Sequence, residues 1–289
     1  MKVLILGVTG MLGSTVFRML QQDKSIRVYG TLRNVSGTDY FPVASQTSLL
    51  ANVDVLDNDS LIAVMTAIKP DLVINCIGLI KQYADVNDPL IALPINAMFP
   101  HRLANLCLLT NARLIHISTD CVFSGRKGMY TEDDVSDAED LYGKSKYIGE
   151  LHDLPHAVTL RTSIIGHELN SNTSLVDWFL SQTGQVKGYK KAIFSGLSTI
   201  ELAKVIRDFV IPNVNLHGLH HISVEPIDKY SLLNLIADVY GKKIDIEADE
   251  KIQIDRSLDS TKFRQATGYV PPSWPQLIEK MHHVHEENN

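Results

Sequence analysis

The string GVTGMLG at residues 7–13 follows the apolar run KVLIL and precedes a stretch with the apolar spacing of a helix. Glycine costs backbone entropy and adds no side-chain packing, so three glycines in seven positions indicate a need for bare backbone. A strand, a glycine turn and a helix in this order predict a dinucleotide-binding loop. Gly7 would permit the tight turn, Gly10 the approach of a pyrophosphate, and Gly13 close packing of helix on strand.

Beyond this loop, apolar runs of strand length alternate with amphipathic stretches of helix length. The runs at 71–78 and 113–119 are nearly continuous, as expected for a parallel sheet covered by helices on both faces. The pattern predicts an α/β fold with a doubly wound parallel (Rossmann) sheet and a smaller C-terminal substrate-binding lobe. We expect the dinucleotide-binding domain over residues 1–163, rejoined by about 197–223, and the lobe over 164–289.

Shorter patterns predict the ends of individual elements. NVDVLD at 52–57 is interpreted as the end of a strand. Asp228 and Gly241 are expected to bound a helix as its N-cap and its C-terminal stop. The last helix ends in MHHVHEE at 281–287, which fits a solvated helix end better than a metal site.

Composition narrows the class of protein. The 289 residues are 45% hydrophobic and 21% charged, with a net charge of −6 and no run of Lys or Arg, so we expect no nucleic-acid or acidic-membrane partner. No segment approaches the roughly 20 apolar residues of a membrane span. Cys76, Cys107 and Cys121 lie in apolar contexts, and we expect reduced thiols in a cytoplasmic protein.

Positions near two strand ends bear on the choice of dinucleotide. The second strand, in YGTLRN at 29–34, ends without the acidic residue that would hold the adenosine ribose, and Arg33 stands close by. A guanidinium there can meet a 2′-phosphate, which favours NADP(H) and leaves NAD(H) open; a solvated arginine is the alternative. Asp54, with its neighbour Val55, is a candidate adenine contact, although an Asp that caps the following turn accounts for it equally well.

Tyr142 and Lys146 in YGKSK are the candidates for proton transfer. On a helix, residues four apart project from one face, and an ammonium lowers the pKa of a phenol from about 10 toward neutrality. The phenol can then act as acid or base, and the lysine can also bind a cofactor ribose. Ser118 and Thr119 end the strand at 113–119, on the edge where ligands bind in such folds, and can direct a hydroxyl at a substrate carbonyl.

With these motifs, the chain resembles the extended short-chain dehydrogenase/reductases, and within them the dTDP-4-dehydrorhamnose reductase group. The resemblance covers nearly the whole length and rests on GVTGMLG, NCIG at 75–78, ISTDCVFSGRKGMYTEDD at 117–134, LYGKSKYIGE at 141–150, LRTSIIG at 160–166 and DRSLDSTKF at 255–263. It implies that Thr119, Tyr142 and Lys146 form a catalytic triad. The dinucleotide site that it implies is lined by Gly7, Thr9, Gly10, Met11, Leu12, Cys76, Ile77 and Gly78.

The implied reaction is hydride transfer from NAD(P)H to the C4 keto carbon of a 4-keto-6-deoxy sugar on a nucleoside diphosphate. Tyr142 would protonate the forming alkoxide, Thr119 would hydrogen-bond the same oxygen, and Lys146 would tune Tyr142 and position the nicotinamide ribose. The second half of the chain would close over the nucleotide sugar. This chemistry requires no metal and none is assigned; a homodimer is compatible with the group.

Three further residues are candidate substrate contacts, each with a structural alternative. Lys81 could meet a phosphate or be an exposed lysine. Trp178 could be a platform for the sugar ring or a core side chain. Arg256 could bind the substrate diphosphate or form a surface salt bridge.

Departures from the group leave alternatives open. Cys121 replaces the tyrosine of the usual STDYVF string, and NCIGLIKQ differs from an alanine-rich equivalent, so a UDP-linked 2-acetamido-4-keto-6-deoxy sugar is a second candidate substrate. A 4,6-dehydratase is disfavoured because no second acid follows Asp120, whereas a C4 epimerase uses the same triad. A non-catalytic subunit, such as the β subunit of methionine adenosyltransferase, shares the fold but has no need of an intact triad.

Overall fold

The computed structural model describes residues 1–79 and 84–288, and its chain divides into two compact units. Unit 1 comprises Met1–Ser118, Glu139–Leu160 and Val214–Leu219. Unit 2 comprises Thr119–Ala138, Arg161–Asn213 and His220–Asn289. Of the predicted triad, Tyr142 and Lys146 therefore belong to unit 1, and Thr119 is the first residue of unit 2.

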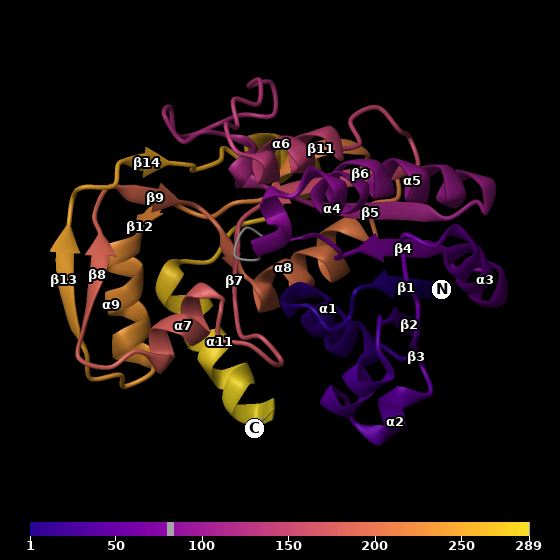
Figure 1. Ribbon diagram of the computed structural model, residues 1–289, viewed down its shortest axis with the longest axis horizontal. Helices are drawn as coiled ribbons and strands as arrows, with labels where there is room; N and C mark the ends of the chain where they lie inside the picture. The colour runs from indigo at the N-terminus through magenta and orange to yellow at the C-terminus, as the bar shows by residue number, and fades with distance from the viewer. Residues whose placement is uncertain (80–83, 289) are drawn as a thin grey trace. The chain divides into compact units, whose positions relative to one another are not determined.

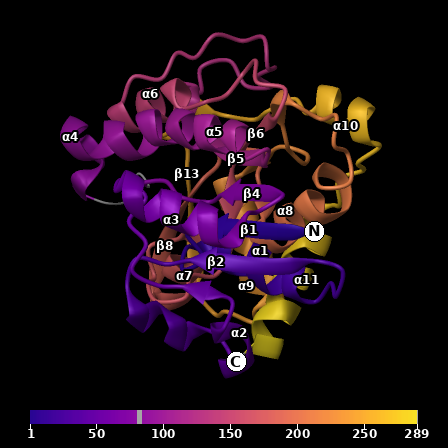
Figure 2. The same ribbon diagram turned by 90° about the vertical axis from the view of Figure 1, so that its right-hand side faces the viewer.

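Seven strands form one sheet with the order β11-β6-β5-β4-β1-β2-β3, which Figure 1 shows from top to bottom. These strands are β1 (Lys2–Leu6), β2 (Arg27–Thr31), β3 (Leu49–Leu50), β4 (Leu72–Asn75), β5 (Arg113–Thr119), β6 (Ala157–Thr162) and β11 (Gly218–His221). The pairs β1–β2, β1–β4, β2–β3 and β4–β5 are parallel. Figure 2 shows β5, β4, β1 and β2 stacked in that order. The predicted doubly wound α/β fold is confirmed.

One face of this sheet packs on two helices, because alternate side chains of a strand point to opposite faces. Leu4 and Leu6 of β1, Val73 of β4 and Leu114 of β5 join a hydrophobic cluster with α3 (Asn58–Ile68) and α5 (Phe99–Leu109). The cluster accounts for the near-continuous apolar runs in the sequence.

The opposite face carries α1 (Met11–Gln21). Ile5 alternates with Leu4 and Leu6 and pairs with Gly30 of β2, so both lie on this other face. A Cβ built on Gly30 would lie 3.2 Å from the Phe17 ring of α1. The bare backbone of Gly30 therefore lets α1 approach the sheet.

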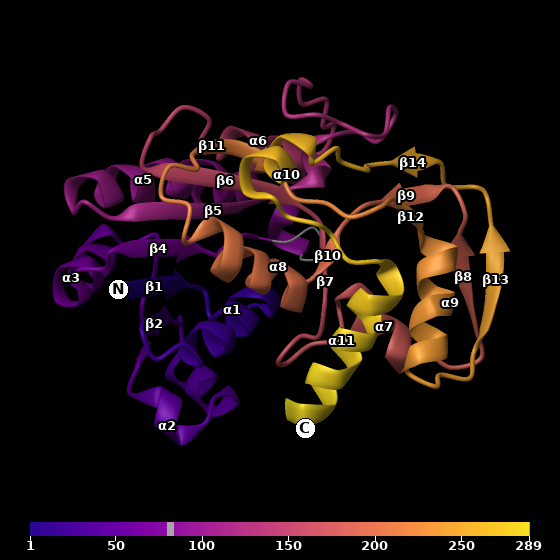
Figure 3. The same ribbon diagram turned by 180° about the vertical axis from the view of Figure 1, so that it is seen from behind.

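Unit 2 is built from short strands and helices (Figure 3). β9 (Ala192–Phe194) lies between β12 (Ile227–Asp228) and β14 (Ile254–Asp255), while β8 (Gln185–Tyr189) pairs with β13 (Asp245–Asp249) and β7 (Ile164–Ile165) with β10 (Leu197–Ser198). Its α-helices are α7 (Leu175–Ser181), α8 (Thr199–Val205), α9 (Lys229–Val239), α10 (Thr261–Thr267) and α11 (Trp274–Asn288). α9 packs on β8 and β13, and α11 packs on α9.

The remaining helical segments are short. In unit 1 they are η1 (Val35–Tyr40), α2 (Val43–Gln46), η2 (Ala84–Asn87), α4 (Pro89–Ala92), the π-helical η3 (Leu93–Met98) and α6 (Leu141–Ile148). In unit 2 they are η4 (Asp120–Val122) and the π-helical η5 (Ile206–Val210). No helix within the described ranges combines the length and apolar character needed to cross a membrane.

The predicted element ends have mixed outcomes. The cap at Asp228 is confirmed, since its Oδ1 accepts from the Ser231 N–H at 2.8 Å, and Gly241 follows α9 with a φ of 62°. The strand ending in NVDVLD is wrong, because the third strand is Leu49–Leu50 and Asn52 turns the chain with a φ of 60°. Its valines pack as loop residues, which apolar spacing alone does not distinguish from a strand.

The glycine turn between β1 and α1 leaves no room for side chains at two of its positions. Gly7 has a φ of 82°, a conformation that favours glycine. A Cβ on Gly13 would lie 2.1 Å from the carbonyl oxygen of Gly7, so α1 touches the turn backbone to backbone. The close packing predicted for Gly13 is therefore a property of this fold.

We expect Gly13→Ala to lower the free energy of unfolding by about 1–3 kcal/mol, because the added methyl forces the turn and helix apart. Gly10→Ala is the matched control, since its Cβ would lie 3.4 Å from the same oxygen and its φ is −77°. Urea unfolding followed by circular dichroism measures both. Equal losses in the two variants would contradict the steric explanation.

Candidate active site

The turn from β1 to α1 presents the open N-terminus of a helix. Gly10 is the N-cap residue, no side chain of the described residues caps it, and the first turn of α1 holds no acidic residue. The Gly10 N–H donates to the Gly7 carbonyl at 3.1 Å and closes the turn. Unpaired N–H groups and the helix dipole favour an anion here. The turn therefore fits the pyrophosphate of a dinucleotide.

The residues predicted to meet the adenosine lie in different surroundings. Arg33 is exposed, two residues beyond the end of β2. Asp54 Oδ1 accepts from the Leu56 N–H at 2.9 Å, so Asp54 caps a turn. This is the alternative that was given above to an adenine contact. Val55 packs against the hydrophobic cluster under α3. Lys81 lies outside the described residues.

The chain leaves β4 through Cys76, Ile77 and Gly78, beside the catalytic lysine candidate. A Cβ on Gly78 would lie 3.6 Å from Asn96 Oδ1 and 3.7 Å from Lys146 Nζ. Burial raises the pKa of the Cys76 thiol to about 12, so the thiol stays neutral. This segment offers backbone and a neutral side chain to a ligand.

Asn96 is a buried residue of this region that sequence reasoning missed. It lies in η3, and its side chain accepts from the Leu79 N–H at 2.9 Å and donates to the Leu79 carbonyl at 3.2 Å. It also donates to Ser145 Oγ of α6 at 3.3 Å. Asn96 thus ties the segment after β4 to the helix that carries Tyr142. A helical pattern interrupted by two prolines was its only signal, and π-helical turns often mark functional sites.

Tyr142 and Lys146 both lie on α6, as predicted. Asp140 caps this helix, since its Oδ1 accepts from the Gly143 N–H at 2.8 Å. Tyr142 is half-buried, whereas Lys146 is 5% exposed and its Nζ donates to the Ile117 carbonyl at 2.8 Å. Ile117 lies in β5, two residues before Thr119, so the lysine ammonium is fixed at the end of that strand.

Glu150 is a second residue that sequence reasoning missed. It follows Lys146 by four residues, is 3% exposed, and its Oε1 accepts from Ser118 Oγ at 2.6 Å. Burial lowers the pKa of Lys146 to about 8, and the Glu150 carboxylate opposes this shift. Because the Ser118 hydroxyl donates to Glu150, we assign Ser118 a structural role and do not propose it as a substrate contact.

Thr119 ends β5 and begins a tight turn. Its Oγ1 accepts from the Cys121 N–H at 3.1 Å and donates to Asp120 Oδ1 at 3.2 Å. Asp120 is 5% exposed, and burial raises its pKa although the charges of Arg256 and Lys229 oppose the shift. The Thr119 hydroxyl is therefore held by a desolvated carboxylate.

The loop after this turn is closed by an aromatic pair. Phe123 stacks on Tyr130 with ring centroids 4.0 Å apart and planes at 7°. The Tyr130 hydroxyl accepts from the N–H groups of Gly125 at 3.2 Å and Lys127 at 3.0 Å. The residues that make the 117–134 string distinctive thus shape the loop that follows Thr119.

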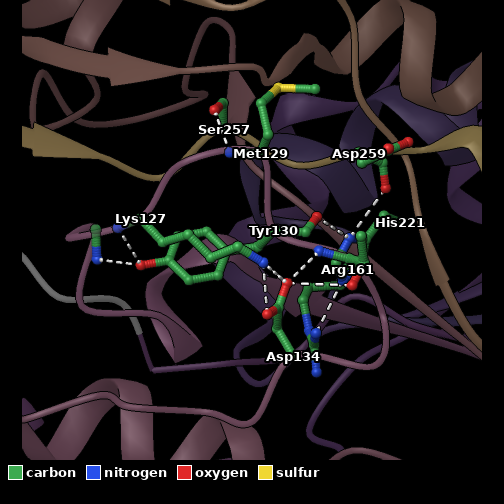
Figure 4. Close-up of polar contacts among 10 residues, drawn as sticks. Lys127, Met129, Tyr130, Asp134, Arg161, His221, Ser257 and Asp259 are labelled. Carbon is green, nitrogen blue, oxygen red and sulfur yellow. Dashed lines mark hydrogen bonds and ion pairs between the residues drawn. The ribbon is translucent and has the colours of Figure 1, made fainter.

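Arg161 packs against this loop, and Figure 4 shows it next to His221. It is 1% exposed, its guanidinium lies 4.9 Å from the Phe123 centroid, and its Nη1 donates to His221 Nε2 at 2.8 Å. His221 Nδ1 faces the carbonyls of Tyr130 at 3.1 Å and Asp259 at 3.2 Å and is the donor to them. Burial lowers the pKa of His221 to about 3, so the ring is neutral.

Trp178 and Arg256, the other two candidate substrate contacts, do not have the structural roles given above as alternatives. Trp178 on α7 is 38% exposed, so the core alternative is wrong for it. Arg256 Nε donates to the Phe123 carbonyl at 2.8 Å, which places its side chain against the loop after Thr119. Both stay candidates for contact with a ligand of unit 2.

The histidine-rich end of α11 is packed. The His285 ring stacks on His167 with centroids 3.6 Å apart, and His167 is paired with Asp177 Oδ1 at 2.5 Å and Tyr240 Oη at 2.8 Å. The expectation of a solvated helix end is wrong for His285, because the ring of His167, which is distant in sequence, stacks on it. Within the described part of the chain, no group of three or more His, Cys, Asp or Glu side chains is arranged to hold a metal.

Comparisons with known proteins agree with this architecture. The family model described as the RmlD substrate binding domain matches residues 1–285. The dTDP-4-dehydrorhamnose reductase of Aggregatibacter actinomycetemcomitans is 25% identical over 259 residues, 80% of this chain and 87% of that protein. Methionine adenosyltransferase 2 subunit beta of Bos taurus is 30% identical over 310 residues, 96% of this chain and 89% of that protein.

A solved structure with the same fold carries a dinucleotide. It is the dTDP-4-dehydrorhamnose reductase of Bacillus anthracis in complex with NADP, with a TM-score of 0.81 and 21% identity. The similarity covers 98% of this chain and 99% of that one. At this identity it supports the fold.

We expect Arg161→Met to lower the free energy of unfolding by about 1–3 kcal/mol, because His221 Nε2 then stays buried without a donor. Lys127→Met is the control: Lys127 Nζ donates to Asp134 Oδ1 at 2.6 Å, but its side chain is 53% exposed. Such exposed pairs contribute less than about 1 kcal/mol. Thermal and urea unfolding measure both variants, and a smaller loss for Arg161→Met than for Lys127→Met would contradict the role of the buried guanidinium.

Proposed function

Because the chain belongs to the RmlD substrate binding domain family, we propose that it is an NAD(P)H-dependent reductase of nucleotide sugars. Its substrate would carry a C4 keto group on a 6-deoxy sugar linked to a nucleoside diphosphate, as does the dTDP-4-dehydrorhamnose of its relative. The observation that carries the proposal is the buried Lys146 ammonium, held 2.8 Å from the Ile117 carbonyl at the end of β5. Burying a cation away from water costs free energy. A role in stabilising a phenolate accounts for a buried lysine at this position.

Side chains of the protein supply the proton in this reaction. When bound, the reduced nicotinamide supplies a hydride to the carbonyl carbon. Tyr142 donates its phenolic proton to the carbonyl oxygen, and Lys146 stabilises the phenolate that remains. Thr119 turns its hydroxyl from Asp120 to the same oxygen. The phenolate then takes a proton from solvent, so the ketone gains one hydride and one proton to become an alcohol.

We assign the dinucleotide to unit 1. The Gly7–Gly10 turn would hold the pyrophosphate, with Thr9, Met11 and Leu12 beside it, and the segment after β4 would line the nicotinamide half. NADP(H) is favoured because Arg33 stands exposed where an acidic residue would select NAD(H). The NADP complex of the Bacillus anthracis relative supports this choice. We assign the nucleotide sugar to unit 2, where Trp178 and Arg256 are candidate contacts.

A second candidate function is that of a non-catalytic subunit. The similarity to methionine adenosyltransferase 2 subunit beta, at 30% identity over 96% of the chain, favours it. Such a subunit does not need Tyr142, Lys146 and Thr119 together. The two functions differ in whether the isolated chain turns over a keto sugar.

We expect the purified chain to oxidise NADPH with a dTDP- or UDP-linked 4-keto-6-deoxy sugar, and Tyr142→Phe to slow this by about 10²–10⁴-fold through loss of the proton donor. Tyr147→Phe is the matched control, since Tyr147 lies on the same helix and is 38% exposed. The loss of NADPH absorbance is the measurement. Equal rates for Tyr142→Phe and the wild type would remove Tyr142 from the mechanism, and absence of turnover with every sugar would favour the subunit.

The rate of reduction is expected to fall as the pH rises through about 8, the pKa to which burial lowers Lys146. Above that pH the lysine is neutral and no longer stabilises the phenolate of Tyr142. Glu150→Gln should move the midpoint of this fall to lower pH, because the carboxylate that raises the pKa of Lys146 is lost. The pH dependence of kcat tests both expectations, and a midpoint that Glu150→Gln leaves in place contradicts the coupling.

A further inference from the structure

The apolar stripe of α11 ends in a histidine. Ile278 and Met281 are buried and anchor the helix in unit 2, and His285 follows Met281 by four residues on the same face. An apolar side chain at position 285 would continue the stripe without a titratable group. Because His285 is half-buried, its charge state affects how well this last turn packs.

Aromatic contacts join the end of α11 to segments that are remote in the chain. The His285 ring lies nearly parallel to the ring of His167, with centroids 3.6 Å apart and planes at 17°. His167 belongs to the segment between β7 and α7. One turn earlier on α11, the His282 ring meets the Tyr240 ring edge-on, with centroids 4.4 Å apart and planes at 76°.

The polar groups beneath the stacked ring already have partners. His167 Nδ1 donates to Asp177 Oδ1 at 2.5 Å, because a carboxylate can only accept, and His167 Nε2 lies 2.8 Å from the Tyr240 hydroxyl. Asp177 Oδ2 accepts from the Glu168 N–H at 2.6 Å. Burial raises the pKa of Tyr240, so its hydroxyl stays neutral. The carboxylate is therefore bonded through both oxygens before any proton reaches the stacked ring.

A proton on His285 opposes this packing. Burial, the neighbouring His167 and, to a smaller extent, His282 lower the pKa of His285. The carboxylates of Asp177 and Glu286 act in the opposite direction without reversing the shift. A base whose pKa is lower in the packed state than in the released state packs more weakly once the pH falls below its released value. For a released histidine that value is about 6.5.

We propose that the stack of His285 on His167 is a pH-sensitive latch of unit 2. It holds the last turn of α11 on the segment after β7 when His285 is neutral, and it releases that turn when His285 gains a proton. The earlier turns of α11 stay packed, because the residues that anchor them are apolar. His167 is bonded to Asp177, the residue before Trp178, so the latch acts beside the helix that carries this candidate sugar contact.

Hydrogen exchange of the full chain, followed by NMR at the amides of residues 282–287, tests the latch. The quantity compared is the protection factor, which removes the intrinsic pH dependence of exchange. We expect wild-type protection to fall about 3–10-fold between about pH 7.5 and 5.5, because release of the turn takes up one proton. His285→Phe should keep its protection over this range, since a phenyl ring stacks without a charge, and His285→Ala should be poorly protected throughout.

His283→Phe is the matched control, because His283 lies on the same helix but its side chain is 73% exposed. It should lose protection with falling pH as the wild type does. Heteronuclear NMR of the His285 ring gives a second readout, and the ring should titrate below the value of about 6.5 for an exposed histidine. Neither measurement requires turnover, so the latch is tested apart from the proposed reductase.

Several results would overturn the latch. Equal wild-type protection across the pH range would show that no proton releases the turn. Wild-type protection in His285→Ala would show that the stack does not hold it. A pH-dependent loss that persists in His285→Phe would assign the proton to another group. A His285 ring that titrates at or above about 6.5 would show that packing does not oppose its charge.

Discussion

The hydrogen bond from the Lys146 ammonium to the Ile117 carbonyl at 2.8 Å is the interaction on which the arrangement of the site depends. It fixes α6 to the end of β5, and with it the position of the phenol one turn earlier. Lys146 is 5% exposed, so its charge is poorly screened. Glu150, itself held by Ser118, opposes the lowering of the pKa of this lysine by burial. A surface lysine at the same spacing would give Tyr142 far less electrostatic help.

A second constraint acts on the loop after Thr119. A buried unit is formed by the Phe123–Tyr130 stack, the Arg161 guanidinium near the Phe123 ring, and the neutral His221 ring. Within it, Arg161 donates a hydrogen bond to His221. This buried unit packs the loop that begins after Thr119 and Asp120. The Thr119 hydroxyl donates to Asp120, and the charges of Arg256 and Lys229 oppose the rise that burial causes in the pKa of Asp120. The candidate residue Thr119 thus precedes a loop whose interior is packed and hydrogen-bonded, the kind of support that a preorganised site requires.

Much of the fold could be predicted from the sequence because its causes are local. The apolar runs specify the strands of a covered parallel sheet, and the glycine turn specifies the first crossover. The strand expected at NVDVLD was wrong because two valines in a turn look like two valines in a strand. The local patterns around Asn96 and Glu150 did not identify their roles, since each bonds a partner that is distant in the chain, Ser145 and Ser118 respectively. The solvated helix end expected at His285 was wrong for the same reason: its partner, His167, is remote in the chain.

The sequence by itself determined the α/β class, the backbone turn that fits a pyrophosphate, and the placement of Tyr142 and Lys146 four residues apart on one helix. These follow from the steric freedom of glycine and from helical periodicity, which act between near neighbours. Only the tertiary structure decided that Lys146 is buried against β5 and that the Ser118 hydroxyl donates to Glu150. It also decided that the charges of Lys229 and Arg256 act on Asp120. Burial and charge pairing depend on which distant segments meet, and no local pattern encodes that meeting.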